Sequence, residues 1–355
     1  MNLVWGIVIG IIALTILVVL HELGHALVAR RNGVRVEEFG IGFPPAAYKK
    51  NVKKSFLGKN VVYSVNWLPL GGFVKLQGEH DDDKKPGDYG AATFWQKTKI
   101  LLAGVAMNWL TAAVLLTLLA WFGLPQLVPH QFTVAGDTRV IYNPVVLASI
   151  EKDLPAESAG LKSGDAIISV NGKKVEASAQ LSEAAAAHKG EMVRVTYKRD
   201  GAERVAHVAL RNTNDDKRGY LGAGLSQERF TRSTWSAPIV GIGVTAQLTG
   251  ITLQGLGQVI GDGVSGLVMK LMPNDSAQKQ ANQKLSSASQ SVGGPLSIFG
   301  ILFPAAERAG MRYVVMMTAL ISLTLAVMNI LPIPALDGGR WFVTAVFRLL
   351  KKPLT

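Results

Sequence analysis

The sequence predicts a polytopic α-helical membrane protein with a membrane-associated β element and an inserted α+β domain. Of its 355 residues, 48% are hydrophobic, and the mean hydropathy of +0.25 is too high for an ordinary soluble protein. Apolar runs long enough to cross a bilayer occupy residues 3–29, 100–124 and 313–336. Residues 130–227 are polar and alternating instead, which is typical of a soluble domain. We therefore divide the chain into a first membrane part (1–129), a soluble domain (130–227) and a second membrane part (228–355).

The amino-acid composition limits the possible metal ligands and binding partners of the chain. The chain has no cysteine, which excludes disulfides and thiolate metal sites, so any transition metal must be held by His and carboxylate groups. The net charge is +12, but the basic residues are scattered and lack the aromatic interleaving of a nucleic-acid surface. We expect no nucleic-acid partner. Membrane topology and contact with anionic lipid explain the charge better, with the lipid bilayer as partner.

The first apolar run ends in an H-E-x-x-H motif, residues 21–25. On a helix, residues four apart share a face, so His21 and His25 can present two imidazole nitrogens to one metal ion. Glu22 then lies beside the metal, where it can take a proton from water. By chance the pattern is expected only about 0.003 times in a chain of this composition. The alternative, that these groups merely cap an apolar helix or face headgroups, is disfavoured because ionisable groups at membrane depth are costly.

Basic residues after the first run predict its orientation. Arg30, Arg31 and Arg35 follow at once, and further lysines lie in residues 49–54. By the positive-inside rule this end is cytoplasmic and the N-terminus is outside. The start lacks the basic n-region and cleavage site of a signal peptide, so we expect the first span to be retained.

Residues 37–79 predict β structure. A Pro-Leu-Gly-Gly turn precedes an alternating stretch, residues 71–76. A helical substrate must be drawn into an extended form before its peptide bonds can be hydrolysed, and a strand edge offers main-chain partners for that form. Gly71, Gly72, Phe73 and Val74 are therefore candidate substrate-binding residues. An ordinary cytoplasmic hairpin is the alternative.

The second run, residues 100–124, is expected to lead from the inside to the outside. Gly104 and Asn108 stand four apart on one face of it, where Gly permits close packing and Asn can donate a hydrogen bond across an interface. We take Asn108 as a candidate substrate-binding residue. Helix packing alone would explain the pair equally well.

The soluble domain predicts a mixture of strands and one helix. The segment 155–165 and the strand and turn at 167–172 resemble the PDZ family. The loop Gly219-Tyr220-Leu221-Gly222 looks like that family's carboxylate-binding loop, whose N–H groups receive a chain terminus or an added strand. Because this loop comes last, the resemblance implies a circularly permuted PDZ domain. Strands are predicted at 145–150, 166–170, 193–197 and 205–210, and a helix at 178–188.

The segment after this domain is ambiguous. Residues 233–260 carry no charge, but Gly, Thr, Ser and Gln lower the hydropathy of this stretch. If they crossed the membrane, the next span would run outward. We therefore expect a surface or partly embedded helix on the outer side, followed by a polar linker at 272–292.

The third run ends in the sequence Asn329-Ile-Leu-Pro-Ile-Pro-Ala-Leu-Asp337-Gly-Gly. Two prolines break the helix at membrane depth, and a carboxylate there is costly unless it meets a cation. Asp337 follows His25 after 312 positions, yet both reach the inner side. We therefore predict Asp337 as the third ligand of a two-His, one-carboxylate Zn²⁺ site with water in the fourth position. The alternative is an Asp that caps the membrane exit and faces the cytoplasm. These ligands also suit iron and cobalt, and zinc is inferred from the motif.

Together these motifs resemble the site-2 protease family of intramembrane zinc metalloproteases, over nearly the whole chain. The resemblance implies a multi-pass protein of the bacterial inner (cytoplasmic) membrane that acts in regulated intramembrane proteolysis. Its substrates would be transmembrane proteins already cleaved on the outer side, such as anti-sigma factors or remnant signal peptides. It also implies an extracytoplasmic PDZ domain, an active site toward the cytoplasmic side, a membrane-reentrant strand at 71–76, and a role for Asn329 in holding the substrate backbone.

Two positions depart from the family pattern, and a second function remains open. Val105 stands where the family often has Pro, and Trp341 to Leu350 is short and interrupted by Arg348 where the family usually has a further span. The competing function is a membrane-anchored PDZ scaffold with a structural or inactive metal site. Glu22 argues against it, because a structural site needs only the two His and the Asp. A metal transporter is weaker, since its ligands would be spread through several spans. The PDZ domain would act as a size filter or would bind the new C-terminus of a cleaved substrate.

Overall fold

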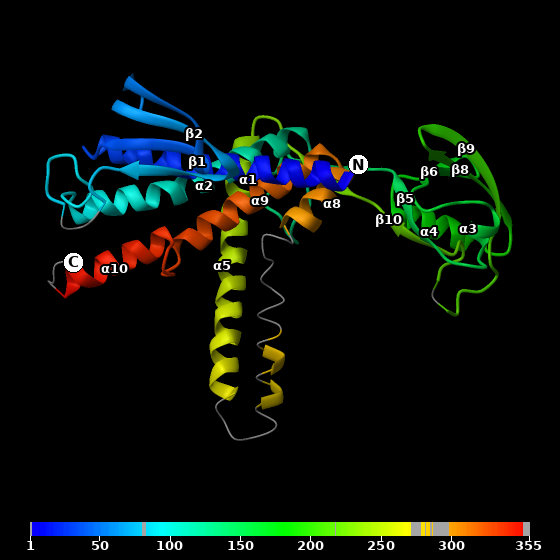
Figure 1. The fold of residues 1–355 in the computed structure, drawn as a ribbon. Helices are drawn as coiled ribbons and strands as arrows, with labels where there is room; N and C mark the ends of the chain where they lie inside the picture. Colours follow the sequence, from blue (N-terminus) through cyan, green and yellow to red (C-terminus); the bar gives the residue numbers. More distant parts are fainter. Residues whose placement is uncertain are drawn as a thin grey trace. The chain divides into compact units, whose positions relative to one another are not determined.

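The computed structural model describes residues 2–79, 83–216, 218–270, 278–280, 282–284, 286 and 298–350. The chain divides into two compact units, and Figure 1 labels most of their helices and strands. The first contains residues 1–120, 132–134 and 235–355, and the second contains residues 121–131 and 135–234. The second unit is wider than the predicted 130–227, because short strands on both sides of that range pair with each other.

Four helices of the described residues are long and apolar enough to cross a membrane, judged by length and composition. They are α1 (Asn2–Arg31), α2 (Phe94–Phe122), α5 (Ala237–Lys270) and α9 (Met311–Ile330). The polytopic helical class agrees with the prediction. Helix α9 ends six positions before the predicted end of its run, because Leu331 is extended (ψ 147°) and two prolines follow it.

The contacts of α1 fix the directions of α2 and α9. Gly24 of α1 faces the carbonyl oxygen of Ala103, whereas Ile9 and Ala13 share a cavity wall with Val114 and Leu115. Residue numbers therefore fall along α2 as they rise along α1, and the two helices are antiparallel.

Helix α9 runs parallel to α1. Val314, near its start, packs with Ala13 in one buried cluster. Ser322, farther along, donates a hydrogen bond of 2.8 Å to the carbonyl oxygen of Asn108, which lies beside His21. The end of α2 and the start of α9 are thus found at the same end of α1.

Helix α5 (Ala237–Lys270) is longer than the helix expected at 233–260. It is a helix as predicted, but it extends to Lys270 and meets the length and hydropathy of a span, so its Gly and Thr content does not exclude a crossing. Its first part packs along α2, where Trp109 donates a hydrogen bond of 3.1 Å to Thr249. A Cβ atom on Gly250 or Gly257 would meet no atom within 4 Å. The predicted linker at 272–292 lies mostly outside the described residues.

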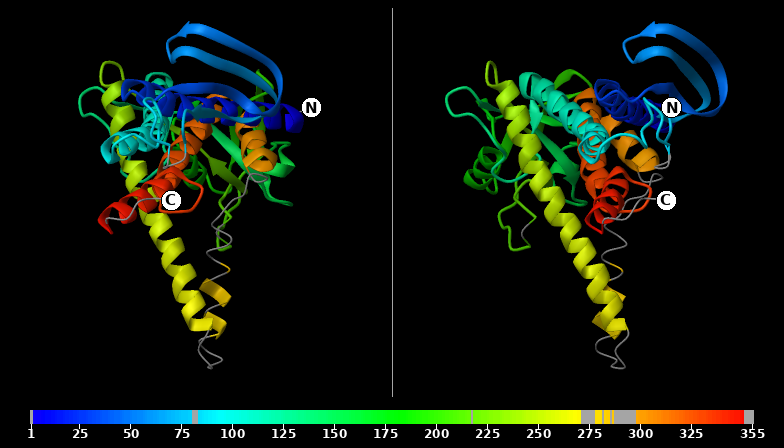
Figure 2. Two further views of the ribbon diagram at one scale, coloured as in Figure 1. Left: turned by 60° about the vertical axis from the view of Figure 1, so that its left-hand side comes forward. Right: turned by 90° about the vertical axis from the view of Figure 1, so that its left-hand side faces the viewer.

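The predicted β element consists of β1 (Val36–Ser55) and β2 (Gly58–Leu76), which curl away from α1 in Figure 2. The segment 36–41 of β1 pairs on one side with 72–76, antiparallel, and on the other side with 62–65. Gly71 has φ +87°, a conformation that favours glycine and turns β2 into its last segment. Among the described residues, no further strand pairs with 72–76, so this segment is an edge.

Short helices complete the first unit: a π-helical turn η1 (Ile298–Leu302), α8 (Phe303–Ala309) and α10 (Asp337–Leu349). Helix α8 packs against the start of α1. The fully buried Phe303 ring lies against Gly10, and Pro304 lies against Gly6, so the two glycines allow this close approach.

The second unit contains a sheet with the strand order β10-β5-β6-β8-β9, to which β7 adds by pairing with β6. One cluster of buried apolar residues from the strands and from α4 forms its core. The strands and helices of this part of the unit are β5 (Val145–Ile150), α3 (Pro155–Ser158), β6 (Ala166–Val170), β7 (Lys173–Lys174), α4 (Ser178–Ala187), β8 (Met192–Arg199), β9 (Ala202–Ala209) and β10 (Ala223–Ser226). A smaller sheet joins β3 (Leu124–Pro125), β11 (Arg229–Arg232) and β4 (Arg139–Tyr142), in that order.

Candidate metal and proteolytic site

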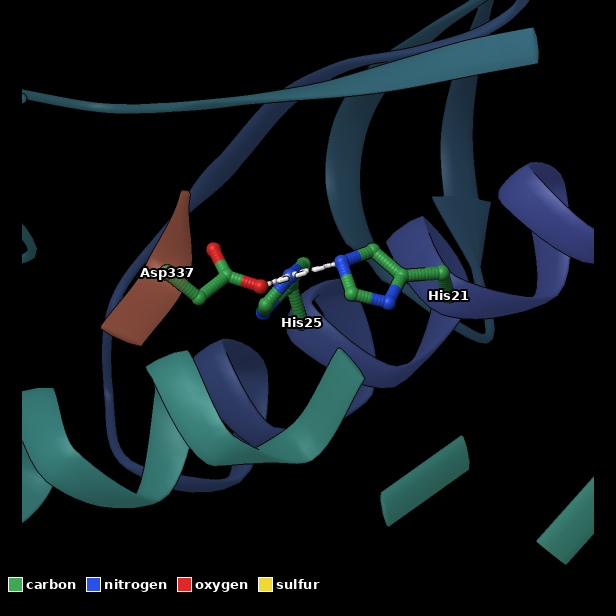
Figure 3. A group of neighbouring side chains, drawn as sticks. All are labelled: His21, His25 and Asp337. Carbon is green, nitrogen blue, oxygen red and sulfur yellow. Dashed lines mark hydrogen bonds and ion pairs between the residues drawn. The ribbon is translucent and has the colours of Figure 1, made fainter. Parts of the chain in front are cut away.

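Three side chains converge in the first unit, two from α1 and one from the start of α10 (Figure 3). Nε2 of His21 lies 3.0 Å from Oδ2 of Asp337, and Nε2 of His25 lies 3.2 Å from the same oxygen. The two Nε2 atoms are 3.1 Å apart. Both imidazoles are buried, at 7% exposure each. The H-E-x-x-H spacing and the distant Asp thus meet at one point, as predicted.

The three atoms have the arrangement of ligands around a cation. The Nδ1 atom of His25 lies 2.7 Å from the carbonyl oxygen of Ile100, which can only accept, so Nδ1 carries a proton. In the neutral imidazole Nε2 then has a lone pair for a metal ion. Oδ2 of Asp337 is buried without a hydrogen-bond partner. Three acceptors this close repel each other unless a positive charge lies between them. Around a tetrahedral Zn²⁺ with bonds of about 2.0–2.1 Å, ligand atoms are about 3.3 Å apart, close to the separations found here.

Close packing of α1 on α2 creates this site. A Cβ atom on Gly104 would lie 2.4 Å from Nε2 of His25 and 2.6 Å from Cε1 of His21. A Cβ atom on Gly24 would lie 2.5 Å from the carbonyl oxygen of Ala103. Both positions therefore require glycine, since any side chain would displace either the imidazoles or the neighbouring helix.

Two further glycines position Asp337. The chain turns between α9 and α10, and α10 begins at Asp337 itself. A Cβ atom on Gly338 would lie 2.3 Å from the carbonyl oxygen of Ile330, and one on Gly339 would lie 2.0 Å from that of Ile333. The first turn of α10 thus packs directly on the backbone of the proline-containing turn, which brings the carboxylate to the two imidazoles.

The edge segment of β2 reaches the same site. The N–H group of Val74 donates a hydrogen bond of 3.1 Å to Oε2 of Glu22. A cavity of about 370 Å³ is lined by Glu22, His25, Asp337 and the segment 72–74. A candidate base, candidate metal ligands and an unpaired strand edge therefore share one cavity, which suits the hydrolysis of an extended peptide.

Comparison with known proteins identifies this constellation. The sequence profile of peptidase family M50 matches residues 9–355. The chain belongs to peptidase family M50. A relative from Clostridium acetobutylicum is 30% identical over 339 residues, which cover 96% of this chain and 86% of the relative. The zinc metalloprotease RasP of Geobacillus kaustophilus is 26% identical and covers 98% of this chain and 91% of its own.

A further relative agrees with this assignment. The zinc metalloprotease Rip1 of Mycobacterium bovis is 27% identical over 99% of this chain and 87% of its own length. A solved PDZ domain from Listeria monocytogenes aligns with 26% of this chain and 93% of its own, at 26% identity and a TM-score of 0.21. This M50 peptidase is therefore a zinc metalloprotease, and the predicted class of enzyme and its metal are confirmed.

The other predicted site residues are distributed differently. Gly71, Gly72, Phe73 and Val74 lie at or next to the cavity. Asn108 is buried at 1% exposure with its amide against His21, so it does not face the cavity. The substrate-binding roles assigned to these residues stay predictions.

Asn329 and the loop 219–222 do not line the cavity that contains Glu22, His25 and Asp337. Asn329 is half-buried near the end of α9, and its side chain makes no hydrogen bond to any described residue. The loop Gly219-Tyr220-Leu221-Gly222 belongs to the second unit. For these residues too, the predicted binding of substrate remains untested.

Sequence reasoning missed three features of the site in this M50 peptidase. The Ile100 carbonyl acts through the backbone, so no residue type could have revealed it. Gly338 and Gly339 were visible in the motif, but their contact with the preceding turn was not. Gly104 was noticed for helix packing, and only the structure shows that it makes room for both imidazoles.

Proposed function

We propose that this zinc metalloprotease hydrolyses peptide bonds within the membrane, in transmembrane substrates already cleaved on the outer side. The observation that carries the proposal is the location of the site. His21, Glu22 and His25 lie on α1, a helix with the length and hydropathy of a span. The two imidazoles contact α2, which has the same character. Soluble substrates do not require such a placement.

The residues of the site have two different roles in hydrolysis, metal binding and proton transfer. His21, His25 and Asp337 would hold the Zn²⁺ ion, which when bound polarises a peptide carbonyl and makes water a better nucleophile. Glu22 takes the proton from the attacking water and delivers it to the amine that leaves, so one carboxylate serves as base and then as acid. Its hydrogen bond with the Val74 N–H holds this carboxylate at the wall of the cavity.

The edge segment 72–76 would hold the substrate in an extended form. A transmembrane helix uses its peptide groups in its own hydrogen bonds, and unwinding it in an apolar medium leaves those groups without partners. Adding the unwound stretch to a strand edge supplies replacements. No strand of the described residues covers the outer edge of segment 72–76, where the N–H groups of Val74 and Leu76 donate to the carboxylates of Glu22 and Glu79. A substrate strand would replace these two carboxylates as the acceptor, which supports a role for segment 72–76 in binding substrate.

Basic residues and helix directions support the proposed topology. Arg30 and Arg31 end α1, which favours a cytoplasmic C-terminal end of α1, in the inner membrane of a bacterium. The chain leaves α2 and enters α9 at the opposite end, so it crosses the membrane an even number of times in between. Residues 271–297 are polar and contain no run long enough to span. Helix α5 therefore does not complete a crossing in this topology, and the PDZ domain between α2 and α5 is extracytoplasmic.

The second unit would recognise an exposed chain end or an extended segment. Its loop 219–222 has its carbonyl groups engaged: those of Tyr220, Leu221 and Gly222 accept hydrogen bonds from backbone N–H groups, and that of Gly219 accepts one from Arg211. The N–H groups of residues 220–222 have no acceptor among the described residues, which suits a carboxylate. Strand β10, which follows, is at the end of the sheet order and is free to accept an added strand.

The experiment that tests the proposal compares the intact protein with its Glu22→Gln variant in detergent. Both should hold about one zinc ion, because the substitution leaves the three ligands in place. Cleavage of a transmembrane model substrate should fall at least about hundredfold in the variant, since general acid–base catalysis contributes that much. A soluble, unstructured peptide serves as the second substrate. Cleavage of the soluble peptide alone, with no cleavage of the transmembrane one, would contradict an intramembrane function.

A further inference from the structure

Asn108 lies at the contact of three membrane helices. Its amide is 3.2 Å from Nδ1 of His21 on α1, and its main-chain carbonyl accepts the hydrogen bond from Ser322 on α9. The side chain is 1% exposed, so it cannot reach a substrate in the cavity without moving. The Asn108 amide faces Nδ1 of His21, so it can determine which of the two ring nitrogens carries the proton.

The imidazole of His21 needs an acceptor at Nδ1. Nε2 of this residue faces Asp337 at 3.0 Å and would be the ligand atom, so it must carry a lone pair. A neutral imidazole then keeps its proton on Nδ1, and that proton must be donated to a partner. An amide N–H facing Nδ1 would force the opposite tautomer, with a proton directed into the ligand site.

Asn108 provides the acceptor when its amide is turned. With Nδ2 facing His21, Oδ1 is buried without a hydrogen-bond partner. Rotation by 180° about the terminal bond exchanges the two atoms at almost no change in shape. Oδ1 then accepts the proton of Nδ1, and the buried oxygen is satisfied. The neighbouring ligand has the same arrangement, because Nδ1 of His25 donates to the carbonyl oxygen of Ile100.

We propose that Asn108 is a positioning residue for His21, rather than a substrate-binding residue. It fixes the ring orientation and the tautomer that leaves Nε2 free for the metal. Groups that hydrogen-bond a ligand imidazole in this way typically contribute ten- to a hundredfold to metal affinity, so about that loss is expected without the acceptor. The inference rests on the proposed ligand set of His21, His25 and Asp337.

The test measures the dissociation constant for Zn²⁺ of the full chain in detergent, by competition with a fluorescent chelator. Asn108→Leu keeps the branching pattern of the side chain and removes the acceptor, and it should weaken zinc binding about ten- to a hundredfold. Asn108→Asp restores an acceptor, and it should bind zinc within a few-fold of the unchanged protein. A packing role predicts the reverse order, with Leu tolerated and the buried carboxylate harmful. That reverse order would overturn the proposal.

Two controls separate this inference from the proposed site. Trp109→Phe removes the neighbouring hydrogen bond between α2 and α5, to Thr249, and should leave zinc affinity unchanged. If zinc affinity falls as far in this variant as in Asn108→Leu, helix packing explains the loss and the inference is wrong. His21→Ala should abolish tight binding. If it does not, the ligand set itself is wrong, whatever the Asn108 variants show.

Discussion

A Cβ atom placed on Gly104 would lie 2.4 Å from Nε2 of His25, nearer than any two such atoms approach in a stable protein. Gly104 is on α2 and His25 is on α1, so the proposed metal site depends on the absence of a side chain from the facing helix. The distance is to a ligand atom, and the smallest side chain is therefore sufficient to disturb the site.

We expect Gly104→Ala to lower zinc affinity at least about tenfold, because the added methyl group displaces the imidazoles from their converged positions. Zinc content after dialysis against a chelator measures the effect. Gly257→Ala is the matched control, since a Cβ atom at that position on α5 meets nothing within 4 Å. This control should retain zinc and gain slightly in helix stability, because Ala is the better helix former. Full zinc affinity in Gly104→Ala would show that α1 and α2 can separate freely.

Val74→Pro tests the strand edge. Proline removes the N–H group that lies 3.1 Å from Glu22, and it is tolerated on an edge strand when that group faces outward. Cleavage of a transmembrane substrate should fall about tenfold, the equivalent of roughly one hydrogen bond of 1.4 kcal/mol. Val74→Ala keeps the N–H group and should cleave nearly as well as the unchanged protein. Equal losses in the two variants would place the effect in the side chain instead.

The second unit has a buried ion pair that predicts a pH dependence. Nε of Arg199 lies 2.6 Å from Oδ1 of Asp165, whose side chain is buried. Burial alone would raise the pKa of Asp165, but the hydrogen bonds from Arg199 and from the Lys162 N–H hold it below its ordinary value of 3.8. A depressed carboxyl pKa stabilises the fold above the unfolded-state value, and this contribution is lost as the pH falls through the folded-state value.

Hydrogen exchange of the full chain checks this expectation. Protection of β6 and β8 should be constant above about pH 5 and should fall below pH 3.8, where the unfolded chain begins to bind the proton. Asp165→Asn should reduce protection at pH 7 and should remove the acid-dependent step. A step of unchanged size in this variant would assign it to other carboxylates.

A substitution at Gly6 tests whether the contact of α8 with α1 positions the start of α9. A Cβ atom on Gly6 would lie 2.4 Å from Cα of Pro304, so Gly6→Val should push α8 off α1 and loosen the start of α9. Thermal unfolding in detergent should begin at a lower temperature. Gly261→Val on α5 adds the same side chain where nothing lies within 4 Å, and it should have the smaller effect. A larger effect at Gly261 would mean that helix propensity, and not docking of α8, controls stability.

The three candidate ligands could be predicted from the sequence, because two of them are close in the chain and the third is a carboxylate that is costly to bury in a membrane. Two His four residues apart on an apolar helix permit few explanations, and a carboxylate at membrane depth demands a cation. These two arguments brought His21, His25 and Asp337 together across 312 positions. The strand of the second unit at 193–197 followed equally well from alternation, because Val193, Val195 and Tyr197 are buried.

Features that depend on the partner of a residue could not be predicted. Asn108 carries the same amide whether it meets a substrate or His21, and only packing decides between them. The pairing of segment 36–41 with two parts of β2 at once is a matter of register, which the alternation of 71–76 does not contain. The length of α5 could not be predicted from composition, because its Gly and Thr residues lower the hydropathy of the segment without shortening the helix.

The distance along the chain between His25 and Asp337 also sets the time between the synthesis of these two residues. A ribosome that adds roughly 5–20 residues per second needs about 15–60 s to synthesise the stretch between them. During that interval α1 and α2 can already be in the bilayer, with both imidazoles and Glu22 in place, but the carboxylate that completes the ligand set does not yet exist. The proposed ligand set of His21, His25 and Asp337 therefore cannot be complete until the start of α10 has been synthesised.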